Sequence, residues 1–453
     1  MMEAEKPDVD VEIERRMDMM RKNRRFLALL LSLCCLSALT PGASAAREEM
    51  VVAISADMEN APWFEEALVS FEAAYPQIEV VLEPHEGISA RSKFVSAAYA
   101  NNAPDVLLAN LYWVKDFAQN GWLTPLSDYF TQEELSDFYP DFVKYATVDG
   151  KVYGLFNSTD VATVIYRKSL LEAAGIELPA LTEAMTWEQF FDAAGKLTRD
   201  TNGDGTPDVW GAGIIGYRGG ATTYTNFPIF FMLGGELINE EGMPVFNSEA
   251  GCGAMQFYHD LVYRYGVSPK ESYSYDNTNL LSSFNAGQYA MLLGASYMIN
   301  DLETQFPGDV GAMLYPVPEA GMDSEGLSGG WMYTIMSQNE DIKPIAAEFI
   351  REMVSSENSV KRYLENGALP VRTSAFEAVG AQLDDTRREW MTVFSKQMEH
   401  TNLKPGDAIY DILQDEYTVA LQEVMMDQKT PEEAVQNAYD NTVLRAKDAG
   451  ILK

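Results

Sequence analysis

Residues 50–82 read MVVAISADMENAPWFEEALVSFEAAYPQIEVVL, and this stretch decides the fold class of the chain. Its first six residues form a short apolar run typical of a buried strand, and a second such run follows at 78–82. Between them, residues 62–75 repeat apolar side chains at helical spacing: Trp63, Phe64, Ala67, Leu68 and Phe71. The order is therefore strand, helix, strand.

The same alternation continues along the chain. A helix expected over 91–101 leads into a buried strand, Ala103-Pro-Asp-Val-Leu-Leu, whose carboxyl end falls at Ala109-Asn110. Further strands are expected at 151–155 and 163–166, followed by a helix over 169–174 that Gly175 ends and by a helix that Thr186 opens. This order predicts parallel sheets flanked by helices, which bind ligands outside the carboxyl ends of their strands.

The length of the chain favours more than one folded unit. With 453 residues, 47% of them hydrophobic, the chain can bury an ample core and is too long for one ordinary domain. We find no linker rich in Ser and Gly and no internal repeat, so we expect two lobes joined by ordered strands.

The amino terminus has the pattern of a secretory signal peptide. A basic cluster at 21–25 precedes the apolar run 26–36, and Ala43-Ser44-Ala45 supplies the small residues of a cleavage site. The apolar run is well short of the ~20 residues that span a bilayer as a helix. The mature chain is expected to begin near Ala46, and Met19 or Met20 is the better start codon because the basic cluster follows it directly.

The three cysteines bear on anchoring and on disulfides. Leu33 precedes Cys34 and Cys35, where a lipidation signal needs a small side chain, so a lipid anchor is the less favoured alternative. Cleavage after Ala45 would leave Cys252 alone in an oxidising compartment, which excludes an internal disulfide and predicts a buried thiol.

Charge and motif content exclude several classes of function. The net charge of −35 repels phosphate backbones, which argues against nucleic-acid binding. The three histidines, His85, His259 and His400, lack ligand spacing, and neither Gly-x-Ser-x-Gly nor a phosphate-binding Gly-rich loop is present. A secreted glycosidase remains an alternative, although no motif selects a pair of carboxylates among the 68 acidic residues.

Nine short motifs occur in the order found in one known family: Ala103-Pro-Asp-Val, Gln119-Asn-Gly-Trp-Leu-Thr-Pro-Leu, Asp149-Gly-Lys-Val-Tyr-Gly-Leu, Ile165-Tyr-Arg-Lys-Ser-Leu-Leu-Glu-Ala-Ala-Gly-Ile, Thr186-Trp-Glu-Gln-Phe, Phe284-Asn-Ala-Gly-Gln-Tyr-Ala-Met, Tyr315-Pro-Val-Pro, Ser328-Gly-Gly-Trp and Leu369-Pro-Val-Arg. Together they resemble the family 1 extracellular solute-binding proteins of ABC transporters, which include the maltodextrin-binding proteins. Each motif alone is weak, whereas the ordered set spans nearly the whole mature chain.

The resemblance implies an α/β fold of the two-lobed, type II periplasmic-binding-protein kind, in which each lobe is a mainly parallel sheet flanked by helices and hinge strands join the lobes. After the signal peptide of residues 1–45, it places 46–157 and about 308–366 in the amino-terminal lobe. It places 158–307 and about 367–453 in the carboxy-terminal lobe, with the ligand cleft between the two.

The resemblance also implies a function: a monomeric, exported protein of the periplasm or cell surface that captures a neutral mono- or oligosaccharide, without chemistry, for its permease. Aromatic faces and a few polar groups suit a sugar, and the expected contacts are Tyr112, Trp113, Asp160, Tyr224, Tyr297, Trp331 and Arg372. For the aromatic residues the alternative is the core, and for Arg372 it is a salt bridge at the hinge. A polyol phosphate, a polyamine or a peptide is the alternative ligand, and maltose itself is not expected because the acidic and basic pair after Pro-Asp-Val is missing.

Residues 200–208 resemble a calcium loop, with oxygen-bearing residues at alternate positions: Asp200, Asn202, Asp204, Thr206 and Asp208. Gly205 stands at position 6, but position 12 is Gly211 where the bidentate Glu belongs. The sequence therefore allows a structural calcium ion and requires no other cofactor. The alternative is a turn in which Asx side chains bond to the backbone.

Overall fold

The computed structural model describes residues 47–452, so the predicted signal peptide, Cys34 and Cys35 lie outside the described residues. From Glu49 onward the chain forms one compact unit that holds two main sheets, of five and four strands. Among the described residues, no helix combines the length and the apolar character needed to cross a bilayer.

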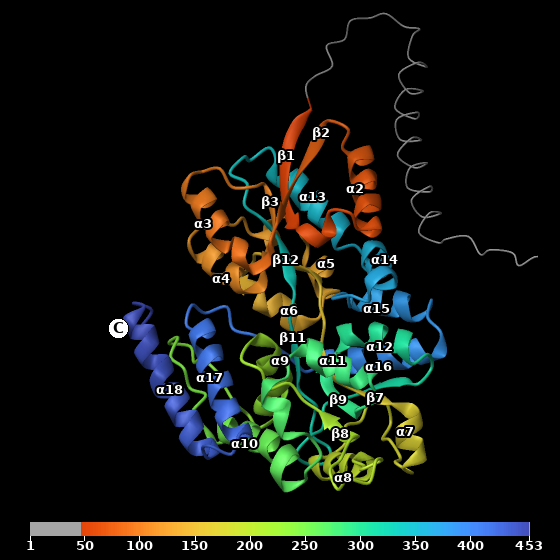
Figure 1. The fold of residues 1–453 in the computed structure, drawn as a ribbon. Coiled ribbons are helices and arrows are strands. Elements are labelled where there is room, and N and C mark those ends of the chain that lie inside the picture. The colour runs from red at the N-terminus through yellow and green to blue at the C-terminus, as the bar shows by residue number, and fades with distance from the viewer. Residues whose placement is uncertain (1–46, 453) are drawn as a thin grey trace, which may run out of the picture. The chain divides into compact units, whose positions relative to one another are not determined.

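The five-stranded sheet has the order β2-β1-β3-β12-β6 and forms the first lobe (Figure 1). The predicted alternation is confirmed by β1 (Glu48–Ser55), α2 (Pro62–Ala74), β2 (Ile78–His85), α3 (Arg91–Tyr99) and β3 (Val106–Asn110). Strands β1 and β3 run parallel, with Val52 opposite Val106. Buried apolar side chains of α2, Trp63 and Phe71 among them, pack into the core of this lobe.

One strand enters the first sheet in the direction opposite to that of β1, β3 and β6, so the expected mainly parallel sheet carries one reversed strand. Strand β12 (Trp331–Ile335) is antiparallel to β3 and to β6 (Leu155–Ser158). The physical reason is the route of the chain, because β12 re-enters this sheet from the other lobe and does not follow a crossover helix within it.

The second lobe contains a four-stranded sheet of order β10-β7-β9-β8, which is also mixed. Strand β7 (Ala162–Arg167) is antiparallel to β9 (Tyr289–Ala295) and to β10 (Val310–Met313), while β8 (Trp210–Gly213) is parallel to β9. Since β10 pairs with β7, the chain returns to the first lobe after β10. The predicted return at about residue 308 was therefore too early.

Helices flank both sheets, with short elements between them (Figure 1). In the first lobe, α2 contacts α13 (Lys343–Met353) and α14 (Ser356–Asn366). The further helices of this part are α4 (Leu111–Gln119), α5 (Gln132–Ser136) and α6 (Pro140–Tyr145). The helices of residues 168–305 are α7 (Lys168–Ala173), α8 (Trp187–Leu197), α9 (Gly220–Met232), α10 (Glu249–His259), α11 (Asn277–Asn285) and α12 (Ile299–Gln305), and the last four are α15 (Thr373–Gly380), α16 (Asp385–Met398), α17 (Tyr410–Met425) and α18 (Pro431–Asp448).

The connections between the lobes are hydrogen-bonded to one another. The first connection between the lobes is the segment 159–161, between β6 and β7. In it, Thr159 exchanges two backbone hydrogen bonds of 2.9 Å with Leu369. Val161 forms a bridge to Ser328 of β11 (Gly326–Ser328), which pairs with β13 (Thr401–Leu403). These contacts confirm the expectation that ordered segments, and not a flexible linker, join the lobes.

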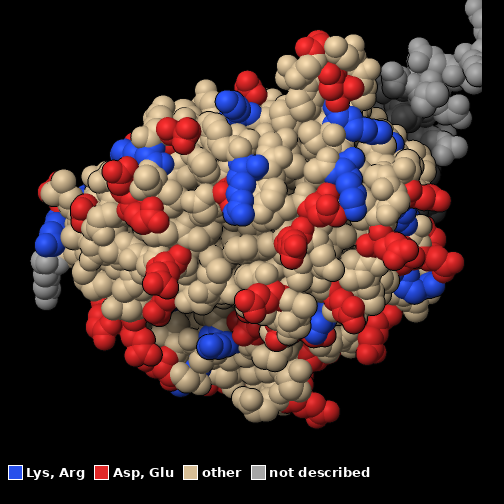
Figure 2. All heavy atoms as spheres, turned by 90° about the horizontal axis from the view of Figure 1, so that it is seen from below, with Lys and Arg blue, Asp and Glu red and all other residues tan. Residues whose placement is uncertain are grey.

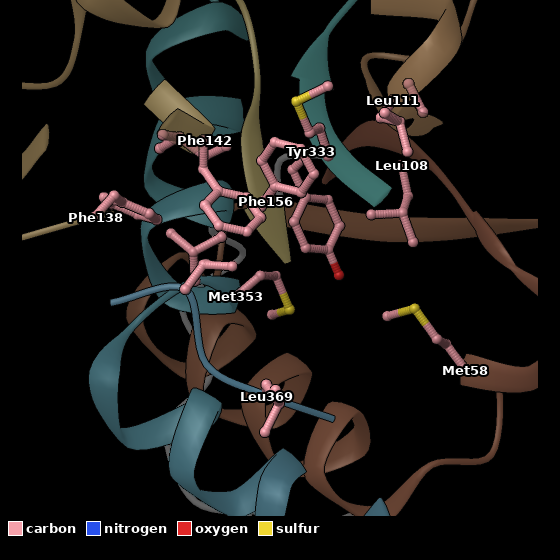
Figure 3. Packing of buried hydrophobic residues seen from close by; sticks show 14 of the residues in the cluster. Met58, Leu108, Leu111, Phe138, Phe142, Phe156, Tyr333, Met353 and Leu369 are labelled. Carbon is pink, nitrogen blue, oxygen red and sulfur yellow. The ribbon is translucent and has the colours of Figure 1, made fainter. Parts of the chain in front are cut away.

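Two hydrophobic clusters support this arrangement. Figure 3 shows part of the first cluster, where Phe138, Phe142 and Phe156 gather near Tyr333 of β12 and Met353 of α13. The second cluster fills the second lobe with large buried rings, among them Phe190, Phe227, Tyr258, Tyr315 and Tyr417. The first cluster also includes residues of the second lobe, among them Ile165, Leu292 and Val310, so apolar packing continues from one lobe into the other.

Candidate ligand site

The site begins at the carboxyl end of β3, as the sequence predicts. Asn110 ends that strand and caps α4, because its side-chain oxygen accepts a 3.2 Å hydrogen bond from the backbone N–H of Tyr112. Tyr112 and Trp113 are thereby held in the first turn of the helix.

A pocket of about 710 Å³ lies between this helix and residues 404–414. Its walls carry aromatic, charged and small residues: Arg91, Tyr112, Trp113, Lys115, Asp116, Gln119, Gly220, Lys404, Pro405, Gly406, Asp407, Ala408, Tyr410, Asp411 and Gln414. The ring of Tyr112 stacks on that of Tyr410, with centroids 5.7 Å apart and an interplanar angle of 25°. Lys115 of α4 forms a 2.9 Å ion pair with Asp407, so side chains from the two sides of the pocket touch.

Asp160 interacts with three groups near the pocket, which are Tyr224, Gly329 and Lys404. Its Oδ1 atom accepts a 2.6 Å hydrogen bond from the hydroxyl of Tyr224 and a 3.2 Å bond from the backbone N–H of Gly329. Burial raises the pKa of Asp160, while these two donors and the positive charge of Lys404 favour the carboxylate. Burial, with the nearby negative charge of Asp160, raises the pKa of Tyr224 well above its usual value.

The close approach of Gly329 to Asp160 depends on the next residue, Gly330. Gly330 has φ of +145°, and a Cβ atom on it would lie 2.6 Å from the backbone oxygen of Ser158. Only glycine tolerates both conditions. The Ser328-Gly-Gly-Trp motif therefore brings β12 close against β6 and directs a backbone donor at Asp160.

Lys404 brings a buried positive charge to the same place. Its side chain is only 6% exposed, and its Nζ atom donates to the backbone oxygen of Gly220 at 2.9 Å and to Oε1 of Gln414 at 3.3 Å. The ammonium also lies over the ring of Tyr224, 5.8 Å from its centroid. Burial lowers the pKa of Lys404 to about 8, although the negative charges of Asp160 and Asp411 act in the opposite direction and favour the protonated form.

Trp331 opens β12, where it is paired with Asn110 on one side and with Ser158 on the other. Its ring meets that of Trp113 edge-on at 5.8 Å and lies 5.5 Å from the ring of His85. Trp331 is half-buried and Trp113 is buried. Trp113 is one of the residues that line the pocket, whereas Trp331 is not among them and reaches the pocket through its contact with Trp113.

The other two predicted contacts, Tyr297 and Arg372, do not line the pocket. Tyr297 is 46% exposed and accepts a 2.9 Å hydrogen bond from the side chain of Asn277, although its phenol still interacts electrostatically with Asp160. Arg372 forms a 3.1 Å ion pair with Asp137, donates to the backbone oxygen of Val354 and lies over the ring of Phe138. The structure thus brings Arg372 into the salt bridge that the sequence offered as its alternative role.

The predicted calcium loop is closed by hydrogen bonds of its own. The carboxylate of Asp200 accepts from the backbone of Gly203 and Gly205, and Asp208 accepts from the backbone and the hydroxyl of Thr201. Asn202 and Asp204 each accept from the residue two positions later. Within residues 47–452 no group of three or more His, Cys, Asp and Glu residues is placed to hold a metal ion. These contacts are those of an Asx-rich turn, and calcium binding stays a prediction.

Of the residues that line the pocket, the sequence predicted Tyr112 and Trp113, and those it missed include Lys404, Tyr410 and Gln414. They follow the last recognised motif, and their closeness to Asp160 and Tyr112 depends on how residues 404–414 pack across the lobes. One sequence pattern could have indicated Lys404, because Pro405 and Gly406 after it are typical of a turn, and binding residues are often found on such loops.

Comparisons with known proteins agree with this architecture. A binding protein of Brucella abortus is 25% identical over 349 residues, which cover 77% of this chain and 82% of that protein. The sugar-binding protein of Xanthomonas citri has a similar fold, with a TM-score of 0.76, 21% identity and coverage of 89% and 99% of the two chains. An ABC transporter solute-binding protein of Thermotoga lettingae, solved with α-D-tagatose, gives a TM-score of 0.67 at 24% identity, with coverage of 88% and 99%.

The match to a family rests on more than half of the chain. The sequence pattern of the family described as bacterial extracellular solute-binding protein extends over residues 55–360, which include β3, Asp160 and the Gly329-Gly330-Trp331 segment. The resemblance carried by the ordered motifs is therefore confirmed. This chain belongs to the bacterial extracellular solute-binding protein family.

Proposed function

We propose that this protein captures a neutral mono- or oligosaccharide outside the cytoplasm and delivers it to the permease of an ABC importer. The observation that carries the proposal is the lining of the pocket: aromatic rings from Tyr112, Trp113 and Tyr410 beside the ammonium group of Lys404, with Trp331 in contact with Trp113 and the carboxylate of Asp160 acting on Lys404. Rings cover the apolar faces of a pyranose, and the charged groups exchange hydrogen bonds with its hydroxyls. Relatives in fold that are named for sugars support the same class of ligand.

The balance of charge in the pocket favours a neutral ligand. Three cations and three carboxylates line it: Arg91, Lys115 and Lys404 with Asp116, Asp407 and Asp411. Two of the cations are already compensated, since Arg91 pairs with Asp116 and Lys115 with Asp407. A polyamine would need an excess of carboxylates and a polyol phosphate an excess of cations, and the pocket offers neither.

We further propose that the ligand is released chemically unchanged. A glycosidase needs one carboxyl group as an acid and a second as a nucleophile or base. Asp116 and Asp407 are engaged in ion pairs, and Oδ1 of Asp160 accepts two hydrogen bonds. In these arrangements Asp116, Asp407 and Asp160 accept hydrogen bonds, which favours a role in binding over acid catalysis by these three groups.

The proposal includes an exported, monomeric protein whose partners are the sugar and the permease. A lipid anchor is the less favoured alternative. Figure 2 shows one face of the molecule, on which many acidic side chains are spread with fewer basic ones among them. With a net charge of −35, such a surface disfavours nucleic acid as a partner.

A thermal-shift panel tests the ligand class directly. Neutral mono- and oligosaccharides, sugar phosphates, polyamines and short peptides are each added to the mature protein, and calorimetry measures the affinity of every compound that raises the melting temperature. We expect stabilisation by at least one neutral sugar and none by polyamines. Stabilisation by a phosphate, a polyamine or a peptide alone would contradict the proposal, and so would cleavage products of the best sugar in chromatography.

A further inference from the structure

Two polar groups at the centre of the site have hydrogen-bonding capacity that the described residues do not use. Asp160 accepts the hydrogen bonds of Tyr224 and Gly329 through Oδ1, and no other residue within 47–452 donates to Oδ2. An ammonium group has three N–H donors, of which Lys404 uses two, for Gly220 and Gln414. One strong acceptor and one strong donor therefore remain.

These two groups attract each other without touching. The charge of Asp160 acts on Lys404 and that of Lys404 acts on Asp160, yet no ion pair joins them in the part of the chain that the structure describes. Tyr224 contacts both, because its hydroxyl binds Asp160 and its ring face lies under the ammonium. Lys404 lines the pocket, and Tyr224 lies in contact with both Lys404 and Asp160, so the two charges stand close to the same cavity.

We propose that Asp160 and Lys404 together bind one vicinal diol of the ligand, with Lys404 as a specificity-determining residue. One hydroxyl donates to Oδ2 of Asp160, and the neighbouring hydroxyl accepts from the ammonium of Lys404. This inference rests on the proposed sugar-binding function and names the chemical group that the site recognises. An amine at this position is repelled by Lys404 and a carboxylate by Asp160, so the pair selects neutral polyhydroxy compounds.

The arrangement makes binding depend on pH in a defined direction. Lys404 has a pKa of about 8 because it is buried, and only its protonated form can donate to the diol. Binding therefore favours the protonated form, so protons are taken up on binding near pH 8 and affinity falls as pH rises. The charged groups that face the ammonium are Asp160 and Asp411. The phenols of Tyr112, Tyr224 and Tyr410 have pKa values raised by burial, so they titrate above this range.

Calorimetry with the best neutral sugar of the panel tests the inference on the wild-type protein. Titrations at pH 8 in phosphate and in Tris, whose ionisation enthalpies differ, report the number of protons taken up. We expect net uptake at pH 8 and about tenfold weaker binding at pH 9 than at pH 7, as the protonated fraction of a group with a pKa near 8 requires. Lys404→Met should weaken binding at pH 7 and abolish both proton uptake and pH dependence. Lys196→Met, which removes an exposed lysine from α8, is the matched control and should behave as wild type.

Deoxy analogues of the same sugar identify the diol. Replacing the hydroxyl that accepts from Lys404 should remove the pH dependence, whereas replacing its neighbour should weaken binding and retain it. If no neutral sugar binds at any pH, the proposed function itself fails. If a sugar binds with no proton uptake and equal affinity at pH 7 and pH 9, only the role of Lys404 is overturned. Because that result needs no variant, a Lys404→Met protein that fails to fold does not obstruct the test.

Discussion

The hydroxyl of Tyr224 donates a 2.6 Å hydrogen bond to Oδ1 of Asp160, and it thereby joins α9 to the first connection between the lobes. The bond has two consequences for the carboxylate. It stabilises the negative charge against burial, and it fixes the orientation of the group, so that Oδ2 is left for a ligand.

Tyr224→Phe removes only this hydroxyl and should weaken sugar binding about tenfold, the order expected when a hydrogen bond to a charged group is lost. Asp160→Asn should weaken binding more, because the charged acceptor itself is gone. Calorimetry measures both variants, and near-ultraviolet circular dichroism checks their folding. Affinity of the wild-type protein should also fall on acidification at a higher pH than an ordinary aspartate gives, because the pKa of Asp160 is raised. Unchanged affinity in both folded variants would place the ligand away from Asp160.

Trp331 supplies the second test, since its ring is half-buried against Trp113 and His85. Trp331→Ala should lose about 1–3 kcal/mol of binding, as removal of an aromatic anchor does at an interface. Trp331→Phe keeps a ring and should recover part of that loss. Trp122→Phe changes a partly buried tryptophan outside the pocket and serves as the control. A folded Trp331→Ala protein with wild-type affinity would assign this ring to packing alone.

Arg372 separates a ligand contact from a structural role. Its side chain is 12% exposed and pairs with Asp137, which also accepts hydrogen bonds from Thr373 and Ser374 at the start of α15. Arg372→Met should therefore lower the free energy of unfolding by about 1–3 kcal/mol and leave sugar affinity within about twofold. Chemical denaturation measures the first quantity and calorimetry the second. Arg264→Met removes an exposed side chain that pairs with Asp260 and should change stability little. A large loss of affinity in Arg372→Met without a loss of stability would restore the ligand role.

Local sequence patterns sufficed for the first elements of the chain but not for the pairing of its strands. The apolar runs at 50–55 and 78–82 predicted β1 and β2, since burial of a short apolar run in a strand requires little knowledge of distant residues. The direction of β12 and the lobe of β10 depend on partners far along the chain: Trp331 pairs with Asn110 and Met313 with Val164. Such contacts leave no local pattern.

The site divides in the same way. Tyr112 and Asp160 could be proposed because they lie next to recognisable strands, whereas Lys404 lies beyond the last motif and its side chain is held by Gly220 and Gln414. Arg372 shows what a motif leaves open, because the motif gives the position of the residue and not the direction of its side chain. In this structure the guanidinium points to Asp137.

The loop at 200–208 gives a test of calcium binding. If it takes up the ion, chelation should lower the melting temperature, since a metal that binds only the folded state stabilises it by about 2.7 kcal/mol at a hundredfold excess over Kd. Asp204→Asn should abolish the difference between calcium and chelator. Asp192→Asn, on the neighbouring helix α8, is the control and should retain it. Identical melting curves of the wild-type protein with calcium and with chelator would leave the Asx-rich turn as the whole role of the loop.

The last prediction concerns closure of the lobes around the sugar. Lys115 on α4 and Asp407 form an ion pair, and Tyr112 stacks on Tyr410, so these contacts form only when residues 404–414 lie against α4. A ligand shifts such an equilibrium only by its differential affinity for the closed form, and a sugar between Tyr112 and Lys404 supplies that difference. Saturating sugar should therefore reduce the radius of gyration in X-ray scattering.

Asp407→Asn tests the contribution of the ion pair to closure. The pair is partly exposed, so its loss should cost less than about 1 kcal/mol and raise the Kd about two- to fivefold, with a correspondingly smaller contraction at a fixed, subsaturating sugar concentration. At saturation the variant should contract as far as the wild type, because the remaining contacts still favour the closed form. A scattering curve that saturating sugar leaves unaltered in the wild-type protein would contradict closure as the mechanism. A variant that binds as tightly as wild type would show instead that Lys115 and Asp407 do not contribute to it.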